Sequence, residues 1–280
     1  MKLIDRIKNR IVSPLSARLI QSADEIWYDA PFGRELKADR QGYLALWEEA
    51  KARPFPEIDA FEKDQGFAID KDWLDNLALI TQIVVKNSKL NYCHGRVLYA
   101  VLRRWLDETP EPLDPLILET GTARGFSALC MAKAFADAGR PGRIITMDVL
   151  PHDTAFLWNC IADTEGPRSR RDLLEDYADL SDRIVFLQGD TRRQIGKLGL
   201  GRVPFAYLDA QHTYQDVMAE AEVVIARQQP GDVIVFDDVT ESIFPGVVQA
   251  VTEIATNRGY RAQSLKSENE RGYAVLTRVE

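Results

Sequence analysis

The chain has 280 residues, with 45% hydrophobic and 28% charged side chains, which is the composition of a globular protein rather than of a disordered chain or a fibre. Its 35 Lys and Arg against 43 Asp and Glu give a formal net charge of −8, and the basic residues form no cluster longer than 168–171, so nucleic acid is not expected as a partner. Three widely spaced cysteines with no CxxC pair argue against a disulfide framework and against a structural zinc site.

The first 110 residues show helical periodicity and few strand signals. Apolar residues at helical spacing between Leu3 and Val12 predict a docked amphipathic helix, with contact to a membrane surface as the less favoured alternative. Further helices are predicted over 36–47, 72–86 and 97–105. Prolines at 110, 112 and 115 then break the pattern. We therefore predict two parts: residues 1–110, a helical N-terminal extension that serves in oligomerisation or as a substrate lid, and the domain 111–280.

The N-terminus lacks the continuous apolar core and the cleavage site of a signal peptide. No apolar run reaches the roughly 18 residues that a membrane span needs. A cytoplasmic protein without a membrane span is expected.

After the prolines, short apolar runs alternate with helical segments. Strands are predicted at 116–120, 143–147, 184–187, 204–208 and 233–236, with helices at 124–137, 213–227 and 246–257. This alternation indicates an α/β fold with a doubly wound, Rossmann-like parallel sheet. The last two runs, 260–265 and 273–277, have only a turn between them, so they are predicted to form an antiparallel C-terminal hairpin.

The loop after the first predicted strand has the spacing of a cofactor-binding turn. Gly121 and Gly125 permit a tight turn and a close helix start, but Ala123 stands where the dinucleotide fingerprint has glycine. The loop therefore suits a cofactor without a pyrophosphate. Asp148 ends the second strand, where a carboxylate accepts ribose hydroxyls, and Asp190 follows the third, where it can meet an adenine amino group. The structural alternatives are a helix cap or a solvated strand end.

Acidic side chains follow the fourth and fifth predicted strands. Asp209 and His212 come after the fourth strand, and Asp237 and Asp238 after the fifth. If these strands are neighbours, three carboxylates meet at one sheet edge, and a hard divalent ion such as Mg²⁺ would offset their repulsion. His212 would then accept a proton from a substrate hydroxyl. The alternatives are a structural histidine, one capping acid and one solvated acid.

Together these residues resemble the class I S-adenosylmethionine-dependent methyltransferases. The closer match is the macrocin-type branch of macrolide-sugar O-methyltransferases, with catechol-type enzymes more distant, and it covers the chain from about residue 87. The resemblance implies a seven-stranded sheet. It places Glu119 and Gly121 along the methionine part of the cofactor, Asp148 on the ribose and Asp190 near the adenine. The full implied cofactor-binding set is Glu119, Gly121, Thr122, Gly125, Ser127, Asp148, Gly189, Asp190 and Asp209.

The resemblance also implies the catalytic groups. Asp209, Asp237 and Asp238 fall where that branch holds Mg²⁺, and His212 falls where it places a general base. Some relatives carry an acid two residues after the first metal ligand, but this chain has Gln211 there, which favours His212 as the base. His94 is considered as a second base, against the alternative of a core or capping histidine.

The predicted function is S-adenosylmethionine-dependent O-methylation of a small hydroxylated metabolite: a sugar, a glycosylated natural product or a phenol. Mg²⁺ is the expected metal, and a homo-oligomer is expected. Two alternatives remain open: another enzyme class on the same fold, or a non-catalytic cofactor-binding scaffold.

Overall fold

A computed structural model describes residues 35–109, 114–267 and 271–280. The predicted amphipathic helix near the N-terminus lies outside these ranges. Among the described residues, no helix combines the length and the apolar character needed to cross a bilayer.

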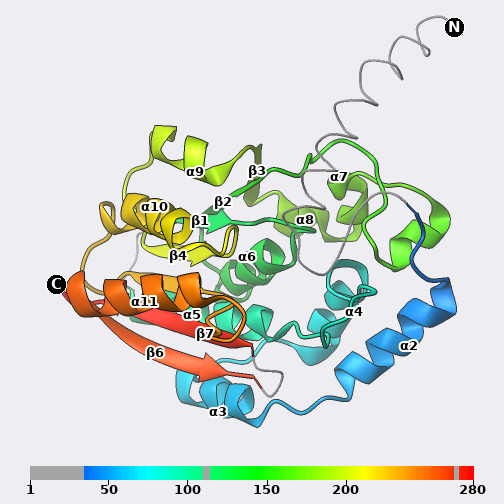
Figure 1. The fold of residues 1–280 in the computed structure, drawn as a ribbon, viewed down its shortest axis with the longest axis horizontal. Coiled ribbons are helices and arrows are strands. Elements are labelled where there is room, and N and C mark those ends of the chain that lie inside the picture. Colours follow the sequence, from blue (N-terminus) through cyan, green and yellow to red (C-terminus); the bar gives the residue numbers. More distant parts are fainter. Residues whose placement is uncertain (1–34, 110–113, 268–270) are drawn as a thin grey trace, which may run out of the picture.

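Seven strands in the described ranges form one sheet, in the order β3-β2-β1-β4-β5-β7-β6 (Figure 1). Neighbours among β1 to β5 are parallel, whereas β7 runs antiparallel to both β5 and β6, as the sequence predicts. The predicted fold class is therefore confirmed. The strands are β1 Leu116–Thr120, β2 Arg143–Asp148, β3 Ile184–Gln188, β4 Phe205–Leu208, β5 Val233–Phe236, β6 Tyr260–Lys266 and β7 Gly272–Arg278.

Helices cover both faces of the sheet (Figure 1). Alternate strand residues point to opposite sides, because side chains in a strand have a period of two. Ile117 and Phe205 belong to the core under α5 and α6, whereas Leu118 and Ala206 belong to the core under α10 and α11. The longer helices are α2 Arg40–Lys51, α3 Pro56–Gln65, α4 Lys71–Thr81, α5 Cys93–Glu108, α6 Phe126–Ala138, α10 Tyr214–Ile225 and α11 Pro245–Asn257. The short ones are α7 Arg170–Leu173, α8 Ala178–Ser181 and α9 Thr191–Gln194.

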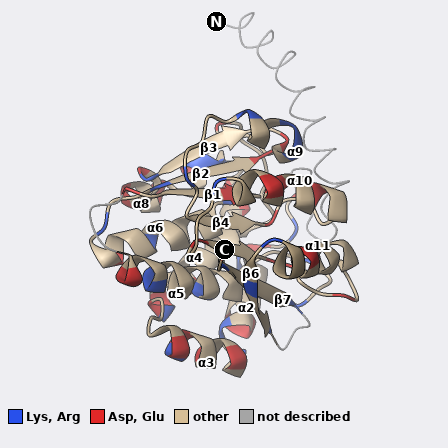
Figure 2. Ribbon diagram, turned by 90° about the vertical axis from the view of Figure 1, so that its left-hand side faces the viewer, with Lys and Arg blue, Asp and Glu red and all other residues tan. Residues whose placement is uncertain are grey.

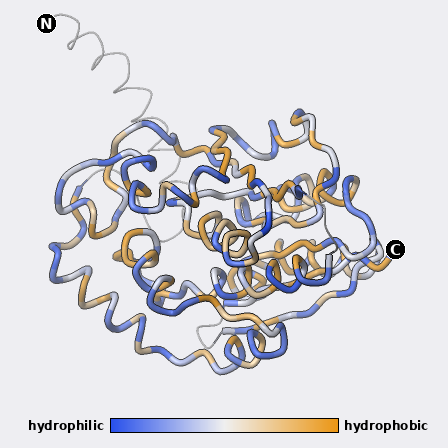
Figure 3. The backbone as a smooth tube through the Cα atoms, turned by 180° about the vertical axis from the view of Figure 1, so that it is seen from behind, coloured by the Kyte–Doolittle hydropathy of each residue, from blue (hydrophilic) through white to orange (hydrophobic). Residues whose placement is uncertain are grey.

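The hydropathy pattern matches this layering. Figure 3 shows hydrophobic segments gathered in the middle of the molecule and hydrophilic segments around the outside. Figure 2 shows mainly acidic positions along α3, which has Glu57, Asp59, Glu62 and Asp64 against one lysine, Lys63. In the described ranges all three cysteines are buried and free, as their spacing predicts.

The described N-terminal helices share their core with the sheet. A Cβ on Gly95 of α5 would lie 2.6 Å from the ring of Phe126 and 2.8 Å from the sulfur of Cys130, so only glycine permits this close approach of α5 to α6. One core cluster runs continuously from α2 to β7. The predicted boundary between two parts at residue 110 therefore remains a prediction, because the core is continuous between the described helices before it and the sheet after it.

One predicted helix is too long. The expected helix over 72–86 ends at Thr81 in α4, and residues 83–86 belong to neither a helix nor a strand. Asn159 holds this segment, because its side chain accepts from the N–H of Val85 at 3.0 Å and donates to the C=O of Val85 at 2.9 Å. A partner 74 positions away thus overrides the local helical periodicity. Leu36, predicted to begin an earlier helix, lies before α2 and is exposed.

Candidate active site

The turn after β1 has a backbone that only particular residues can adopt. Gly121 has φ +86°, and a Cβ there would lie 2.0 Å from the carbonyl oxygen of Asp209. Gly125 has φ +91° and precedes α6 directly. The two predicted glycines therefore bring β1, β4 and α6 together at the carboxyl edge of the sheet, where doubly wound folds bind their ligands.

The peptide of Ala123 is held from both sides. Its N–H donates to Asp148 Oδ2 at 2.6 Å, and its C=O accepts from Nε of the buried Arg170 at 2.8 Å. Ala123 has φ +45°, a conformation uncommon outside glycine, which these two bonds stabilise. Asp148 Oδ1 also accepts from the N–H of Leu150 at 2.8 Å. Asp148 therefore shapes the turn itself, and its predicted role on a ribose stays a prediction.

Glu119 is fully buried at the end of β1. It accepts hydrogen bonds from the hydroxyls of Thr146 and Ser127, but its Oε1 has no hydrogen-bond partner in the described chain. Burial raises the pKa of Glu119 to about 7, despite the hydroxyls that favour the ionised form. A buried carboxylate with one unpartnered oxygen is suited to a ligand that donates a hydrogen bond or carries positive charge.

A cavity beside this turn is lined by five of the predicted cofactor-binding residues: Gly121, Asp148, Gly189, Asp190 and Asp209. Asp190 occupies the N-cap position of α9, but its side chain makes no capping bond; it forms an ion pair with Arg193 at 3.2 Å. The Asp190 side chain therefore does not cap α9, which was the structural alternative for this residue.

Glu220 of α10 is a residue that the sequence reasoning missed. It is buried and accepts from the hydroxyls of Thr120, at the end of β1, and Thr191, at the start of α9. Glu220 therefore links the end of β1 to the start of α9 through two hydrogen bonds, next to this cavity. A buried acid at helical spacing gives no sign of such a role, because its partners lie 100 and 29 positions away.

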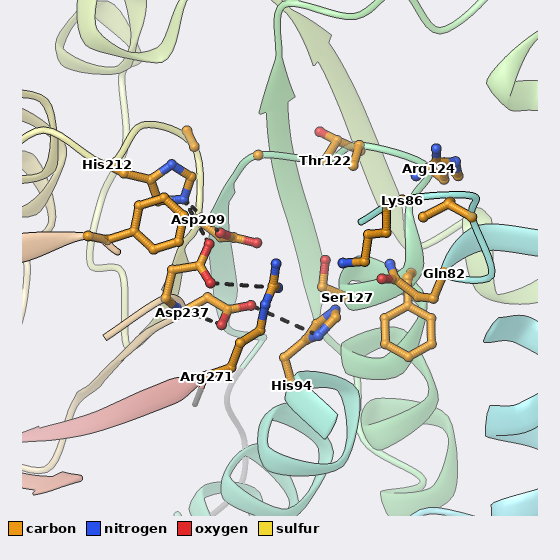
Figure 4. Close-up of a pocket in the computed structure, with 17 residues that line it drawn as sticks. Gln82, Lys86, His94, Thr122, Arg124, Ser127, Asp209, His212, Asp237 and Arg271 are labelled. Atoms are coloured by element: carbon orange, nitrogen blue, oxygen red, sulfur yellow. Dashed lines mark hydrogen bonds and ion pairs between the residues drawn. The ribbon is translucent and has the colours of Figure 1, made fainter. Parts of the chain in front are cut away.

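Strands β4 and β5 are neighbours, as the carboxylate prediction requires, with Leu208 paired to Phe236. The residues that follow these strands meet in a second cavity (Figure 4). His212 Nε2 lies 3.1 Å from Asp238 Oδ2 and 3.7 Å from Asp209 Oδ1. Ligand atoms of these three residues lie within 4.8 Å of one another, which is compatible with holding one metal ion.

Asp237, the third predicted metal ligand, lies next to this group but is engaged elsewhere. Its Oδ2 accepts from the hydroxyl of Tyr207 at 2.9 Å, and its Oδ1 accepts from the N–H of Asp238 at 2.6 Å. Burial, together with the charges of Asp209 and Asp238, raises the pKa of Asp237 well above its usual value. The tyrosine bridges two predicted ligands, because its oxygen also lies 3.1 Å from Asp209 Oδ2.

The electrostatics of His212 follow from its two carboxylate neighbours. Burial acts to lower its pKa, but Asp209 and Asp238 outweigh burial and raise the pKa to about 10. Its ring also stacks on Phe244, with centroids 4.3 Å apart. In the metal-free protein His212 therefore carries a proton at neutral pH.

His94 comes to the same cavity from α5. It lies parallel to the Tyr207 ring and edge-on to Phe126, and its Nδ1 has no hydrogen-bond partner in the described ranges. The nearest carboxylate oxygen, Asp237 Oδ2, is 3.9 Å away. Burial lowers the pKa of His94 to about 3, so it is neutral where His212 is charged.

Four further polar residues line this cavity that the motifs did not predict: Gln82 and Lys86 from the segment after α4, Arg124 from the turn after β1, and Arg271 just before β7. Figure 4 shows Lys86 and Arg271 pointing into the cavity opposite each other. Gln82, Lys86 and Arg271 belong to no strand-end motif, so no spacing in the sequence indicates them.

Comparison with known proteins addresses the fold and the family. Residues 118–239, which include Glu119 to Asp238, match a family model described as a methyltransferase domain. No curated protein matches the chain.

Solved structures agree with the fold of this methyltransferase. The O-methyltransferase TomG of Streptomyces achromogenes, solved with SAM, has a TM-score of 0.52 at 16% identity, over 76% of this chain and 92% of TomG. The O-methyltransferase of Bacillus cereus, solved with SAH, has a TM-score of 0.50 at 19% identity, over 86% of this chain and all of that protein. The match to the methyltransferase domain supports the predicted class of enzyme, a methyltransferase, and these structures share its fold.

Proposed function

We propose that this methyltransferase moves the methyl group of S-adenosylmethionine to a hydroxyl oxygen of a small metabolite: a sugar, a glycosylated natural product or a phenol. One observation carries the proposal. The cavity with Asp148 and Asp190 and the cavity with His212 adjoin, because Gly121, Asp209 and Ala210 line both. A donor in the first cavity would thus present its reacting end to an acceptor in the second.

The donor half uses the predicted residues. Asp148 and Asp190 would face the ribose and adenine, and the unpartnered oxygen of Glu119 would face the amino-acid end. Gly121, Thr122 and Ser127 would border that end, since they line the second cavity. The O-methyltransferases TomG and that of Bacillus cereus, which share the fold, were solved with SAM and SAH.

The acceptor half uses His212. The acceptor oxygen forms a bond to the methyl carbon as the carbon–sulfur bond breaks, the sulfur keeps the bonding electrons, and the hydroxyl proton passes to the imidazole of His212. Most of the acceleration would come from holding the two reactants in line within a closed cavity. His212 performs its part only when it is neutral, which requires that the charge of its carboxylate neighbours be offset.

The donor set fits a divalent cation. Asp209 and Asp238 supply hard oxygen ligands, and Asp238 Oδ1 is buried without a hydrogen-bond partner in the described chain. When bound, such an ion lowers the pKa of an acceptor hydroxyl and takes up the carboxylate charge. We assign Asp209 and Asp238 to hold it, and Asp237, predicted as the third ligand, would have to leave Tyr207 to join them.

Calorimetric titration with S-adenosylmethionine and S-adenosylhomocysteine, each with Mg²⁺ or with EDTA, tests the donor site. Binding of both supports the proposal, whereas no binding to folded protein refutes it. Sugars and phenols are then screened as acceptors.

His212→Ala is expected to keep its affinity for S-adenosylmethionine but to lose about 10²–10⁴-fold in turnover, as removal of a general base does. His152→Ala, which removes a histidine stacked on Phe186 outside both cavities, is the matched control.

A further inference from the structure

Arg271 enters the cavity just before β7, where hydrogen bonds hold the backbone of Arg271 and Gly272. Its C=O accepts from the N–H of Ser267 at 2.8 Å. The following residue, Gly272, accepts from Val239 N–H at 2.9 Å and donates to Thr240 Oγ1 at 3.1 Å. A Cβ on Gly272 would lie 2.1 Å from the carbonyl oxygen of Val239, so the start of β7 is packed against the loop that follows β5. That loop begins at Asp237 and Asp238.

The guanidinium of Arg271 lies among the aspartates. It is 3.6 Å from Asp238 Oδ1, and Figure 4 shows the side chain pointing into the cavity toward the carboxylates. Asp238, Asp237 and Asp209 all stabilise its charge, so the pKa of Arg271 is raised further above its usual value. The guanidinium therefore stays charged under all ordinary conditions.

The other buried arginines near the site are used differently. Arg124 donates to the carbonyl of Trp158, and Arg170 donates to the carbonyl of Ala123. Both bind backbone carbonyls. Arg271 instead forms an ion pair with Asp238.

We propose that Arg271 is a built-in counter-cation of the aspartate group, one that weakens the binding of a divalent ion and stabilises the group when no ion is bound. The inference rests on the proposed cation at Asp209 and Asp238. Two cations that share one carboxylate repel each other, and the repulsion is strong where burial excludes water. The metal of this enzyme would therefore be loosely held and exchangeable.

The experiment measures Mn²⁺ affinity by the electron paramagnetic resonance signal of the free ion, in the full chain. Arg271→Gln removes the charge, and we expect its Mn²⁺ dissociation constant to fall at least about tenfold, since a shared charge is lost from a buried site. Arg271→Lys keeps a charge on a shorter side chain, so its Mn²⁺ dissociation constant should lie between those of Arg271→Gln and the unmodified protein. Arg261→Gln makes the same change at an exposed position of β6 and should match the unmodified protein.

Thermal unfolding gives a second readout. In EDTA, Arg271→Gln should unfold at a lower temperature than the unmodified protein, because the aspartates lose the charge of Arg271 and keep only that of His212 close to them. Saturating Mn²⁺ should raise its midpoint by more than it raises that of the unmodified protein, because an ion that binds only the folded state stabilises it. If Arg271→Gln does not fold, Arg271→Lys decides through the same two measurements.

Unchanged or weaker Mn²⁺ affinity in folded Arg271→Gln, or in Arg271→Lys if that variant alone folds, overturns the inference. So does an absence of Mn²⁺ binding in all variants up to ~10 mM, a weak-binding limit for such sites. Titration with S-adenosylhomocysteine in EDTA keeps the proposed function separate, since donor binding does not require the ion. If the protein binds S-adenosylhomocysteine but Arg271→Gln leaves the Mn²⁺ affinity unchanged, only the role of Arg271 is refuted. If Arg271→Gln raises the Mn²⁺ affinity but S-adenosylhomocysteine does not bind, the role of Arg271 is supported and the donor site is refuted.

Discussion

His212 and His94 lie in one cavity, yet their surroundings drive them to opposite protonation states. Carboxylates raise the pKa of His212 to about 10, whereas burial without a close partner lowers the pKa of His94 to about 3. Both histidines are candidate bases on sequence alone, but in the folded protein His212 is a cation and His94 is neutral. Their neighbours come from different strands and helices, so this difference was not readable from the motifs.

The raised pKa of His212 predicts a pH dependence of stability in the metal-free protein. A folded pKa of about 10, against 6.5 for the free side chain, means that the protonated state stabilises the fold. This stabilisation is complete below about pH 6.5 and is lost as the pH rises through about 10. In EDTA, the free energy of unfolding measured with urea should therefore fall between these pH values by more than it falls in His212→Gln.

The difference between the two proteins isolates His212, because other groups that titrate in this range are common to both. An equal fall in the two proteins would show that His212 is not protonated by its carboxylate neighbours in the folded state.

At the scale of elements, the strand ends were the most predictable part of the site. Parallel strands place their carboxyl ends at one edge, so the sequence predicts that Asp209, Asp237 and Asp238 meet if β4 and β5 are neighbours, and they do. The segments that complete the cavity are not predictable from the sequence. Lys86 lies in a predicted helix that ends earlier in the structure, and the position of Arg271 depends on how the start of β7 packs against the loop after β5.

The turn after β1 allows a test of close packing apart from backbone strain. Gly121 and Gly139 both have positive φ, +86° and +64°, but only Gly121 would place a Cβ against other atoms. Gly139→Ala should therefore cost about 1–2 kcal/mol of unfolding free energy from strain alone. Gly121→Ala should cost clearly more than this and should abolish donor binding, as measured by urea unfolding and calorimetry.

Similar costs for the two substitutions, with donor binding kept in Gly121→Ala, would show that β1 and β4 can separate at this point without harm to the site.

At the scale of the whole molecule, the N-terminal helices are part of the enzyme's structure. Asn91 donates to Ser267 Oγ at 2.8 Å, and the N–H of Lys266 donates to Glu57 at 2.7 Å, so the first helices contact the last hairpin. His94 of α5 also reaches the cavity. The sequence change at the prolines was readable, but it marks a change of local pattern and the packing continues across it.

A fragment of residues 111–280 is therefore expected not to fold on its own. Removing α5 would expose the face of α6 that carries Phe126 and Cys130, which are buried against Gly95 in the full chain. The fragment should lack near-ultraviolet circular dichroism and a cooperative urea transition, whereas the full chain should show a single transition. A fragment that unfolds cooperatively and binds S-adenosylhomocysteine would establish residues 111–280 as an independent domain.

The three buried thiols have a practical consequence for following motion in this enzyme. Burial raises the pKa of Cys93 to about 12 and that of Cys160 to about 11, and raises the pKa of Cys130 well above its usual value. Thiolates are the reactive form, so the closed molecule should be inert to alkylating reagents. Cys93 lies in α5, Cys130 in α6 and Cys160 in the crossover after β2. The rate at which each becomes alkylated therefore reports how often its own region opens, without any introduced label.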